Sequence, residues 1–309
     1  MNAASPPTRV TSTESGLVVV DKPAGLTSHD VVSRVRRLAR TRKVGHAGTL
    51  DPMATGVLLL GVNKATRLLG HLALTEKAYD AELRLGAATT TDDAEGEVVS
   101  TASAEALAAL TGSAVGTALA GLVGDIEQVP SSVSAVKVDG QRAYRRVRAG
   151  EDVELPARRV TVHDITVHDL VRREGFLDVR ISVRCSSGTY IRAIARDVGR
   201  TLGVGGHLTA LRRTAVGAVG IDEAATLAAL DEAGQVDLMP LPEVARRFFA
   251  TLDVDDLAAR DVGFGRSLDV RLPGPGPVAL LGPDGDLLAL FEHRATDPDG
   301  PARPVAVFV

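Results

Sequence analysis

Strand and helix patterns follow one another irregularly along this chain of 309 residues, and this order constrains the fold more than any other feature. β-Branched or alternating apolar runs predict strands at residues 16–21, 57–62, 78–85, 159–170 and 176–185. Helical patterns occur between some of these runs, as at about residues 29–40, where Val31, Val32, Val35 and Leu38 share one face, but they do not form regular strand–helix–strand units. We therefore predict an α+β protein in which helices flank a central mixed, largely antiparallel sheet.

The composition changes near residue 250, which predicts three parts. Residues 1–15 are rich in Ala, Ser, Thr and Pro and predict a flexible tail. Residues 16–250 are expected to form the large domain. Residues 251–309 combine short strand patterns with the hairpin signal Asp284-Gly285, which predicts a small β-rich domain.

The cysteine count, the hydropathy pattern and several missing motifs exclude whole classes of protein. Cys185 is the only cysteine, so an internal disulfide and a zinc cluster of cysteines are both impossible. The apolar runs are far shorter than the roughly 20 residues of a membrane helix, and the first residues lack the apolar core of a secretory signal. The motifs of P-loop ATPases, dinucleotide-binding enzymes, zinc proteases and α/β-hydrolases are missing. We expect a cytoplasmic protein that does not enter a membrane.

The charge distribution is uneven, although the net charge is only −4. Residues 16–90 carry 11 Lys and Arg against 6 Asp and Glu, a net of +5, whereas residues 252–309 carry 5 against 10, a net of −5. Six cations lie between residues 34 and 43, and four arginines surround Tyr144 in residues 142–148. A local basic field attracts a polyanion such as RNA whatever the net charge, but each stretch also fits a solvated surface.

The most unusual segment is GHAGTLDPMATG, residues 45–56, which predicts a tight loop. Its Asp51 could act as a nucleophile, a general base or a metal ligand, or could simply begin an Asp-Pro turn. His46 in the same segment could be a base or a ligand, or merely hydrogen-bonded. A metal site that also uses His29 and Asp30 would require a folding accident, because no helical i,i+4 pair of ligands exists.

A second candidate segment, residues 188–192, opens the helix expected at 189–201. Its free backbone N–H groups, together with Arg192, could hold an anion. The alternative is an ordinary helix start with Tyr190 packed in the core.

Seven segments in this order carry a family resemblance: GLVVVDKPAGLTS (16–28), GHAGTLDPMATG (45–56), KAYDAELRLG (77–86), TTTDDAEG (89–96), IEQVPSSVSAVK (126–137), RCSSGTYIR (184–192) and GHLTALRRT (206–214). Together they resemble the bacterial tRNA pseudouridine-55 synthases, the TruB family, over about residues 16–215. The resemblance implies the pseudouridine synthase fold, with residues 16–250 as the catalytic domain and residues 251–309 as a PUA-like domain that binds RNA or is structural.

The resemblance also implies the reaction and the partners. The chain would isomerise uridine 55 in the T-loop of tRNAs to pseudouridine, without a metal or an organic cofactor. The tRNA T-arm stem-loop would be its substrate, no protein partner would be obligatory, and the chain would be a monomer. The basic stretches at residues 34–43 and 142–148 then become expected phosphate contacts. Replacing Arg36, Arg37 and Arg40 with Ala is expected to weaken tRNA binding.

By the same resemblance, Asp51 is the nucleophile that attacks the flipped-out uridine, at either base C6 or ribose C1′. Tyr79 would stack on the target base and is the candidate for handling the C5 proton. Arg192 would pair with Asp51 and keep it ionised, as a nearby opposite charge does.

The remaining roles concern the space around the base. Tyr190 and Leu211 would line the uracil pocket, and His46 would fill the space that the flipped nucleotide leaves. General chemistry agrees, because a base inside a folded loop must be extruded before an enzyme can reach it, and the detached uracil needs a dry pocket.

Two alternatives remain open. The protein could act chiefly as a tRNA folding chaperone, since opening the T-arm to flip a base disrupts tertiary contacts. It could also modify other RNAs or work in a guide-RNA complex. Asp51→Asn separates the first alternative from the enzyme, because it should abolish isomerisation and leave tRNA binding and folding assistance intact.

Overall fold

The computed structural model describes residues 13–131, 137–138, 141–142, 155–274 and 276–309. The chain forms two compact units, each made of separate segments. Unit 1 contains Met1–Asp51, Val57–Ala73 and Gly217–Val309, and unit 2 contains Pro52–Gly56 and Leu74–Val216. The chain thus passes from unit 1 to unit 2 directly after Asp51.

Unit 1 begins with a small mixed sheet and the helices next to it. Its strands are β1 (Gly16–Lys22), β2 (Val44–Ala47), β3 (Thr55–Val62, of which the first two residues belong to unit 2), β13 (Val219–Gly220), β14 (Ala225–Thr226) and β15 (Met239–Pro240), and its helices are α1 (Ser28–Leu38), η1 (Asn63–Leu68), α2 (Leu69–Ala73), η2 (Ile221–Glu223), α7 (Leu227–Ala233) and α8 (Leu241–Phe248). The strand order is β14-β1-β3, with β2 antiparallel on β3, β15 antiparallel on β1, and β14 parallel to β1.

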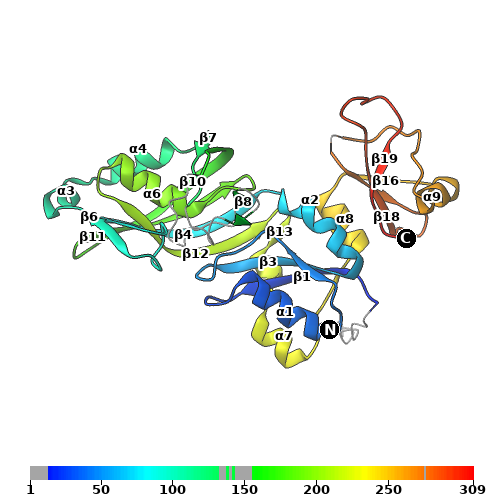
Figure 1. Ribbon diagram of the computed structural model, residues 1–309, viewed down its shortest axis with the longest axis horizontal. Helices are drawn as coiled ribbons and strands as arrows, with labels where there is room; N and C mark the ends of the chain where they lie inside the picture. Colours follow the sequence, from blue (N-terminus) through cyan, green and yellow to red (C-terminus); the bar gives the residue numbers. More distant parts are fainter. Residues whose placement is uncertain (1–12, 132–136, 139–140, 143–154, 275) are drawn as a thin grey trace, which may run out of the picture. The chain divides into compact units, whose positions relative to one another are not determined.

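Helix α1 forms where the sequence predicts a helix. Thr27 is its N-cap and shares a capping box with Asp30, which satisfies two backbone N–H groups at the helix start. Val31, Val32 and Val35 are buried on one face. The yellow helix α7 lies beside the blue α1 in Figure 1, although almost two hundred residues separate them in the sequence.

Unit 2 is built on an antiparallel sheet in the order β12-β4-β11-β10-β7. Its strands are β4 (Lys77–Leu85), β5 (Ala87–Thr89), β6 (Val98–Thr101), β7 (Gly124–Gln128), β8 (Lys137–Val138), β9 (Gln141–Arg142), β10 (Arg158–Arg173), β11 (Phe176–Cys185) and β12 (Gly206–Val216), and its helices are α3 (Ala104–Ala109), α4 (Gly112–Ala120) and α6 (Ile191–Thr201). Every second residue of β4 is buried, as expected of a strand with one face on a core. Helix α6 lies along β12 and β4 and supplies that core (Figure 1).

The last part of unit 1 has its own four-stranded sheet and apolar core. It consists of β16 (Thr251–Asp253), α9 (Asp256–Gly263), β17 (Val278–Leu281), β18 (Leu287–Glu292) and β19 (Arg303–Val307), with the sheet order β16-β17-β18-β19. Val262 of α9, Leu280 of β17 and Phe291 of β18 meet in its core. The predicted Asp284-Gly285 hairpin joins β17 to β18, and Gly285 has the positive φ of +79° that such a turn needs.

The predicted α+β class is confirmed: a mixed, largely antiparallel sheet is flanked by helices, and a small β-rich region ends the chain. The loop expected at residues 45–56 is shorter, because residues 45–47 pair with β3. Helix α4 was not predicted, since glycines at its start and in its middle lower the helix propensity. The boundaries 1–15, 16–250 and 251–309 remain predictions.

Residues 143–148 of the basic stretch around Tyr144 and residues 1–12 of the tail lie outside the described residues. Within the described part of the chain, no helix is long and apolar enough to span a membrane.

Candidate functional site

Asp51 lies in the connection between β2 and β3 and is half-buried. The connection turns at Gly48, which has a φ of +85°. It ends at Gly56, with a φ of +102°, where a Cβ atom would lie 2.2 Å from the carbonyl oxygen of Arg213 on β12. Only glycine tolerates both conditions at residue 56, so the loop is held to the strand by backbone contact.

The residue before Asp51 is fixed by a side chain from α1. The Ser28 Oγ accepts a hydrogen bond from the Leu50 N–H at 2.9 Å and donates one to the Leu50 carbonyl oxygen at 3.1 Å. Both residues are 3% exposed. The loop therefore enters Asp51 from a buried backbone position whose donor and acceptor are both satisfied.

His46 lies in β2, opposite Leu60 of β3, and is half-buried. Its ring meets the ring of His29 edge to face, with 6.0 Å between the centroids. The Asp30 carboxylate accepts hydrogen bonds from the backbone N–H and the hydroxyl of Thr27, which lower the pKa of Asp30. Asp30 is thus a helix cap, and the described residues contain no group of three or more His, Cys, Asp or Glu that could hold a metal ion.

Tyr79 and Leu211 lie on neighbouring strands of unit 2 and share its buried face. Tyr79 of β4 is 9% exposed and faces Arg213 of β12 in the strand register. Leu211, two residues before Arg213, is 8% exposed and faces Ala81 of β4. The structure therefore brings these two predicted pocket residues to one face of the sheet.

Tyr190 is the residue that precedes α6, and an amide side chain from β7 holds its backbone. Its N–H donates to the Gln128 Oε1 at 2.8 Å, and its carbonyl oxygen accepts from the Gln128 Nε2 at 3.2 Å. Gln128 therefore binds the Tyr190 N–H, one of the backbone donors at the helix start that could otherwise hold an anion.

Arg192, in the first turn of α6, is buried and carries a salt bridge to Asp93. Its Nη1 lies 3.2 Å from the Asp93 Oδ2 and donates to the Thr91 carbonyl oxygen at 3.0 Å. Arg192 and Asp93 are each 4% exposed. The next residue back, Asp92, has a φ of +60° and pairs with Arg196 at 3.1 Å, while burial raises the pKa of the Asp92 carboxyl. Charged side chains thus tie the segment 89–96 to α6.

Two cations are buried close to Tyr79. Lys77 of β4 is 6% exposed and Arg213 is 1% exposed. Burial, and next the positive charge of Arg213, lower the pKa of Lys77 to about 8. Burial also raises the pKa of Cys185, which faces Lys77 from β11, to about 11, so this cysteine is a core residue and not a reactive thiolate.

The six cations of residues 34–43 divide into three groups. Arg34 and Arg37 form salt bridges with Asp231 of α7, the second at 3.0 Å. Arg36 donates a hydrogen bond to the Val44 carbonyl oxygen at 3.0 Å. Arg40, Arg42 and Lys43 follow α1, are exposed, and make no side-chain hydrogen bond or ion pair with any described residue. The single negative charge of Asp231 offsets one of the two charges of Arg34 and Arg37, whereas the last group faces solvent with no carboxylate partner and is the better candidate for a phosphate contact.

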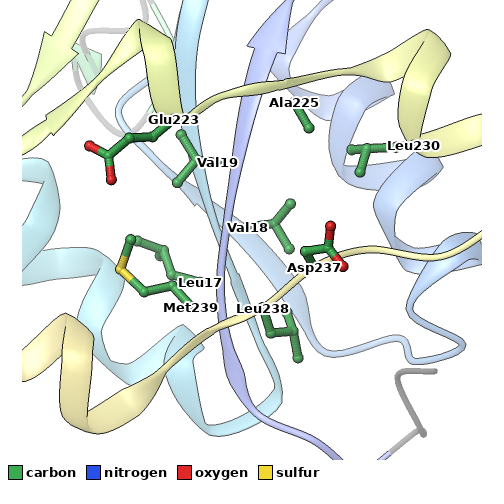
Figure 2. Close-up of a pocket in the computed structure, with 9 residues that line it drawn as sticks. All are labelled: Leu17, Val18, Val19, Glu223, Ala225, Leu230, Asp237, Leu238 and Met239. Carbon is green, nitrogen blue, oxygen red and sulfur yellow. The ribbon is translucent and has the colours of Figure 1, made fainter. Parts of the chain in front are cut away.

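A cavity of about 230 Å³ lies beside β1 in unit 1 (Figure 2). Nine residues line it: Leu17, Val18, Val19, Glu223, Ala225, Leu230, Asp237, Leu238 and Met239. None of them is a predicted site residue. The Glu223 carboxylate is bound by Arg247, which lowers the pKa of that carboxyl. The cavity is small for a nucleotide and gives no alternative active site.

Sequence reasoning missed three partners of the predicted residues: Ser28, Gln128 and Asp93. All three lie in segments that carry the family resemblance. Their place in those segments was the only indication in the sequence. Their partners could not be inferred, because they lie 22 residues away for Ser28, 62 for Gln128 and 99 for Asp93.

Models of one protein family match most of the chain. A model described as TruB family pseudouridylate synthase (N terminal domain) matches residues 36–191, tRNA pseudouridylate synthase B C-terminal domain matches residues 192–238, and tRNA Pseudouridine synthase II, C terminal, matches residues 249–309.

Curated relatives match nearly the full length. The chain is 54% identical over 306 residues to tRNA pseudouridine synthase B of Streptomyces griseus, covering 97% of this chain and 99% of the relative. It is 56% identical over 297 residues to the protein of the same name from Thermobifida fusca, covering 95% and 98%. A solved structure entitled "Crystal Structure of a Cbf5-Nop10-Gar1 Complex" matches with a TM-score of 0.69 and 26% identity, covering 95% of this chain and 83% of that one.

Proposed function

We propose, since the chain belongs to the TruB family of pseudouridylate synthases, that it converts uridine 55 in the T-loop of tRNA into pseudouridine. Family membership makes the chain a pseudouridine synthase, an isomerase. The observation that carries the proposal is 54% identity, over nearly the full length, to a curated tRNA pseudouridine synthase B.

The proposed reaction moves one glycosidic bond. The bond between uracil N1 and ribose C1′ breaks, a bond between C5 and C1′ forms, the C5 proton passes to solvent, and N1 takes up a proton, so that substrate and product have the same composition. We assign Asp51 as the nucleophile that acts on the flipped-out uridine. Its half-buried position, directly after a backbone held by Ser28, supports this role because a nucleophile must be kept in one geometry.

The remaining proposed site residues come mainly from unit 2. Tyr79 would stack on the base and handle the C5 proton, and Tyr190 and Leu211 would line the uracil pocket. Burial of Tyr79 and Leu211 on one sheet face supports a dry pocket. His46, in unit 1, would fill the space left by the flipped nucleotide.

Arg192 would keep Asp51 ionised. A guanidinium has five N–H donors, so the salt bridge to Asp93 does not by itself exclude a second carboxylate. The pair with Asp93 supports the role in another way, because it holds the Arg192 side chain in one place.

We propose further that the protein acts on the tRNA T-arm as a cytoplasmic monomer, without a metal or an organic cofactor. An isomerisation has no net electron transfer, so a redox cofactor would have no task. Residues 251–309 would form the PUA-like domain and either bind RNA or support the fold.

The test is tritium release from unmodified tRNA that carries [5-³H]uridine. Wild type should release tritium in an amount equal to one uridine per tRNA, and Asp51→Asn should release none while binding tRNA with nearly unchanged affinity. A tRNA with cytidine at position 55 should release none with either protein, which tests the position.

Three results would contradict the proposal. Release by Asp51→Asn at the wild-type rate would reject the nucleophile. Release from the tRNA with cytidine 55 would reject the position. Binding without release by wild type would favour a tRNA folding chaperone.

A further inference from the structure

The two hydrogen bonds between Ser28 and Leu50 end one residue before Asp51, and Ser28 itself has no assigned role in the proposed reaction. Ser28 is the first residue of α1, and Leu50 is the last residue before the candidate nucleophile. The Ser28 Oγ uses its proton on the Leu50 carbonyl oxygen, at 3.1 Å, and one lone pair on the Leu50 N–H, at 2.9 Å.

This arrangement fixes the peptide plane that carries Asp51. The Leu50 carbonyl and the Asp51 N–H belong to one planar peptide unit. A hydrogen bond to that carbonyl therefore limits rotation of the backbone on the N-terminal side of Asp51. The second bond, to the Leu50 N–H, holds the preceding peptide unit, so both planes flanking Leu50 are anchored to α1.

Hydrogen bonds also hold the segment before Ser28. The Lys22 side chain is fully buried, and its Nζ donates to the carbonyl oxygens of Pro23, at 3.0 Å, and Leu26, at 2.7 Å. A single ammonium group thus ties together both ends of the turn 23–26. The Thr27 cap then starts α1, which delivers Ser28 in a defined orientation.

These contacts form a relay within unit 1: Lys22 orders the turn, Thr27 starts the helix, and Ser28 anchors Leu50. The loop needs such an anchor because residues 48–54 belong to no helix or strand. Gly48, at a φ of +85°, adds backbone freedom to the same loop in the unfolded chain.

We propose that Ser28 is a positioning residue for catalysis, which sets the backbone at Leu50 so that the Asp51 carboxylate is presented in its reactive orientation. This inference rests on the proposed function, in which Asp51 is the nucleophile. Ser28 is 3% exposed and its hydroxyl is used on Leu50, so its loss should lower the rate of the chemical step and leave tRNA affinity intact. A displacement of about 1 Å at a reacting group can cost 10²-fold in rate.

The test is single-turnover tritium release with saturating enzyme, at a temperature well below every variant's unfolding midpoint. Ser28→Ala removes both hydrogen bonds and should slow release about 10- to 100-fold, with the Kd for tRNA within about twofold of wild type. Ser28→Cys keeps the approximate size but has a weak donor and acceptor, and should fall in the same range. Ser28→Thr keeps the hydroxyl and should recover most of the rate. Ser33→Ala is the matched control, because it removes a hydroxyl from the same helix whose hydrogen bond goes to the His29 carbonyl oxygen, within the helix, and not to Leu50.

A merely structural role predicts a different pattern. In that case Ser28→Ala would lower the unfolding midpoint but release tritium at the wild-type rate while folded, and this result would overturn the proposal. If Ser28→Ala does not fold, Ser28→Cys decides: a wild-type rate rejects the role and a slow step with normal Kd supports it. Asp51→Asn in the same assay separates the two proposals, because an inactive Asp51→Asn with a fully active Ser28→Ala rejects only the positioning role.

Discussion

The segments around Asp51 and around Arg192 hold their key side chains by opposite means. The Asp51 loop is fixed by neutral hydrogen bonds from Ser28 and by a backbone contact at Gly56. Arg192 is fixed by a buried carboxylate, Asp93. The contrast has a physical reason: an uncharged anchor leaves the charge of a carboxylate nucleophile unaltered, whereas a buried guanidinium needs a counter-ion to offset its desolvation.

The contrast predicts which changes each segment tolerates. The Asp51 loop should be sensitive to added atoms and insensitive to charge. The Arg192 segment should be sensitive to charge. Gly56→Ala and Asp93→Asn test this difference directly, and the buried Lys77 and the exposed cations after α1 extend the comparison to charges elsewhere in the chain.

Gly56→Ala should have the largest effect, a loss of about 4 kcal/mol or more in the free energy of unfolding. The new Cβ would lie 2.2 Å from the Arg213 carbonyl oxygen, in a backbone conformation that disfavours L-residues. Gly25→Ala is the control: Gly25 also has a positive φ, but its added Cβ meets nothing within 4 Å, so about 1 kcal/mol is expected. Denaturant titration measures both, and equal losses would show that steric contact at Gly56 is unimportant.

Asp93→Asn should cost about 3 kcal/mol of unfolding free energy, because it removes the buried negative charge that pairs with the buried Arg192 guanidinium. The matched control is Asp169→Asn, which breaks the exposed pair of Asp169 with Arg180 and should leave the unfolding midpoint nearly unchanged. If Asp93→Asn and Asp169→Asn had the same free energy of unfolding, the stability of the Arg192 segment would not depend on its buried charge pair.

Lys77 should make stability rise with pH. Its pKa is about 8 in the folded protein, below the ordinary value of 10.5, so between these pH values the unfolded chain holds a proton that the folded protein has lost. The free energy of unfolding of wild type should therefore increase from pH 8 to pH 10 relative to that of Lys77→Met, by up to about 1.4 kcal/mol per pH unit. Lys43→Met, at an exposed lysine, should parallel wild type. A flat difference for Lys77→Met would show that the lysine is not buried as described.

The smallest effect concerns the basic stretch after α1. Replacing Arg40, Arg42 and Lys43 with Ala should weaken tRNA binding about tenfold near physiological salt. The slope of log Kd against the logarithm of the salt concentration should decrease by about two to three. Replacing Arg34 and Arg37, which share the single negative charge of Asp231, should change the slope less. Binding titrations at several salt concentrations measure this. If both variants showed the same salt dependence of log Kd, Arg40, Arg42 and Lys43 would be ordinary solvent-exposed residues without a special role in tRNA binding.

Local elements were predictable because they depend on neighbouring residues. The apolar spacing in residues 29–40 predicts α1, and the alternation in residues 78–85 predicts β4. Helix α4 escaped prediction because burial of Val115 and Leu119, and not helix propensity, stabilises it. The shortening of the loop at residues 45–56 also came from a partner strand, since β2 exists only as a neighbour of β3.

The candidate site divides in the same way. The segments that contain Asp51, Tyr79 and Arg192 could be picked out from the sequence, because residue types and spacing carry the family resemblance. The residues that hold these side chains in place could not be picked out in this way. The anchor of Leu50, the counter-ion of Arg192 and the neutralisation of Arg34 each depend on a residue brought near by folding.

The fold class, the family and the residues that could carry the chemistry depend on short patterns and side-chain identity, so they can be inferred from the amino-acid sequence. That Ser28 holds Leu50, that Asp93 pairs with Arg192 and that Asp231 pairs with Arg34 and Arg37 is visible only in the folded chain. The reason is physical: hydrogen bonds and ion pairs act over a few ångströms in space, and the positions that meet at that distance here lie from 22 to nearly 200 residues apart in the chain.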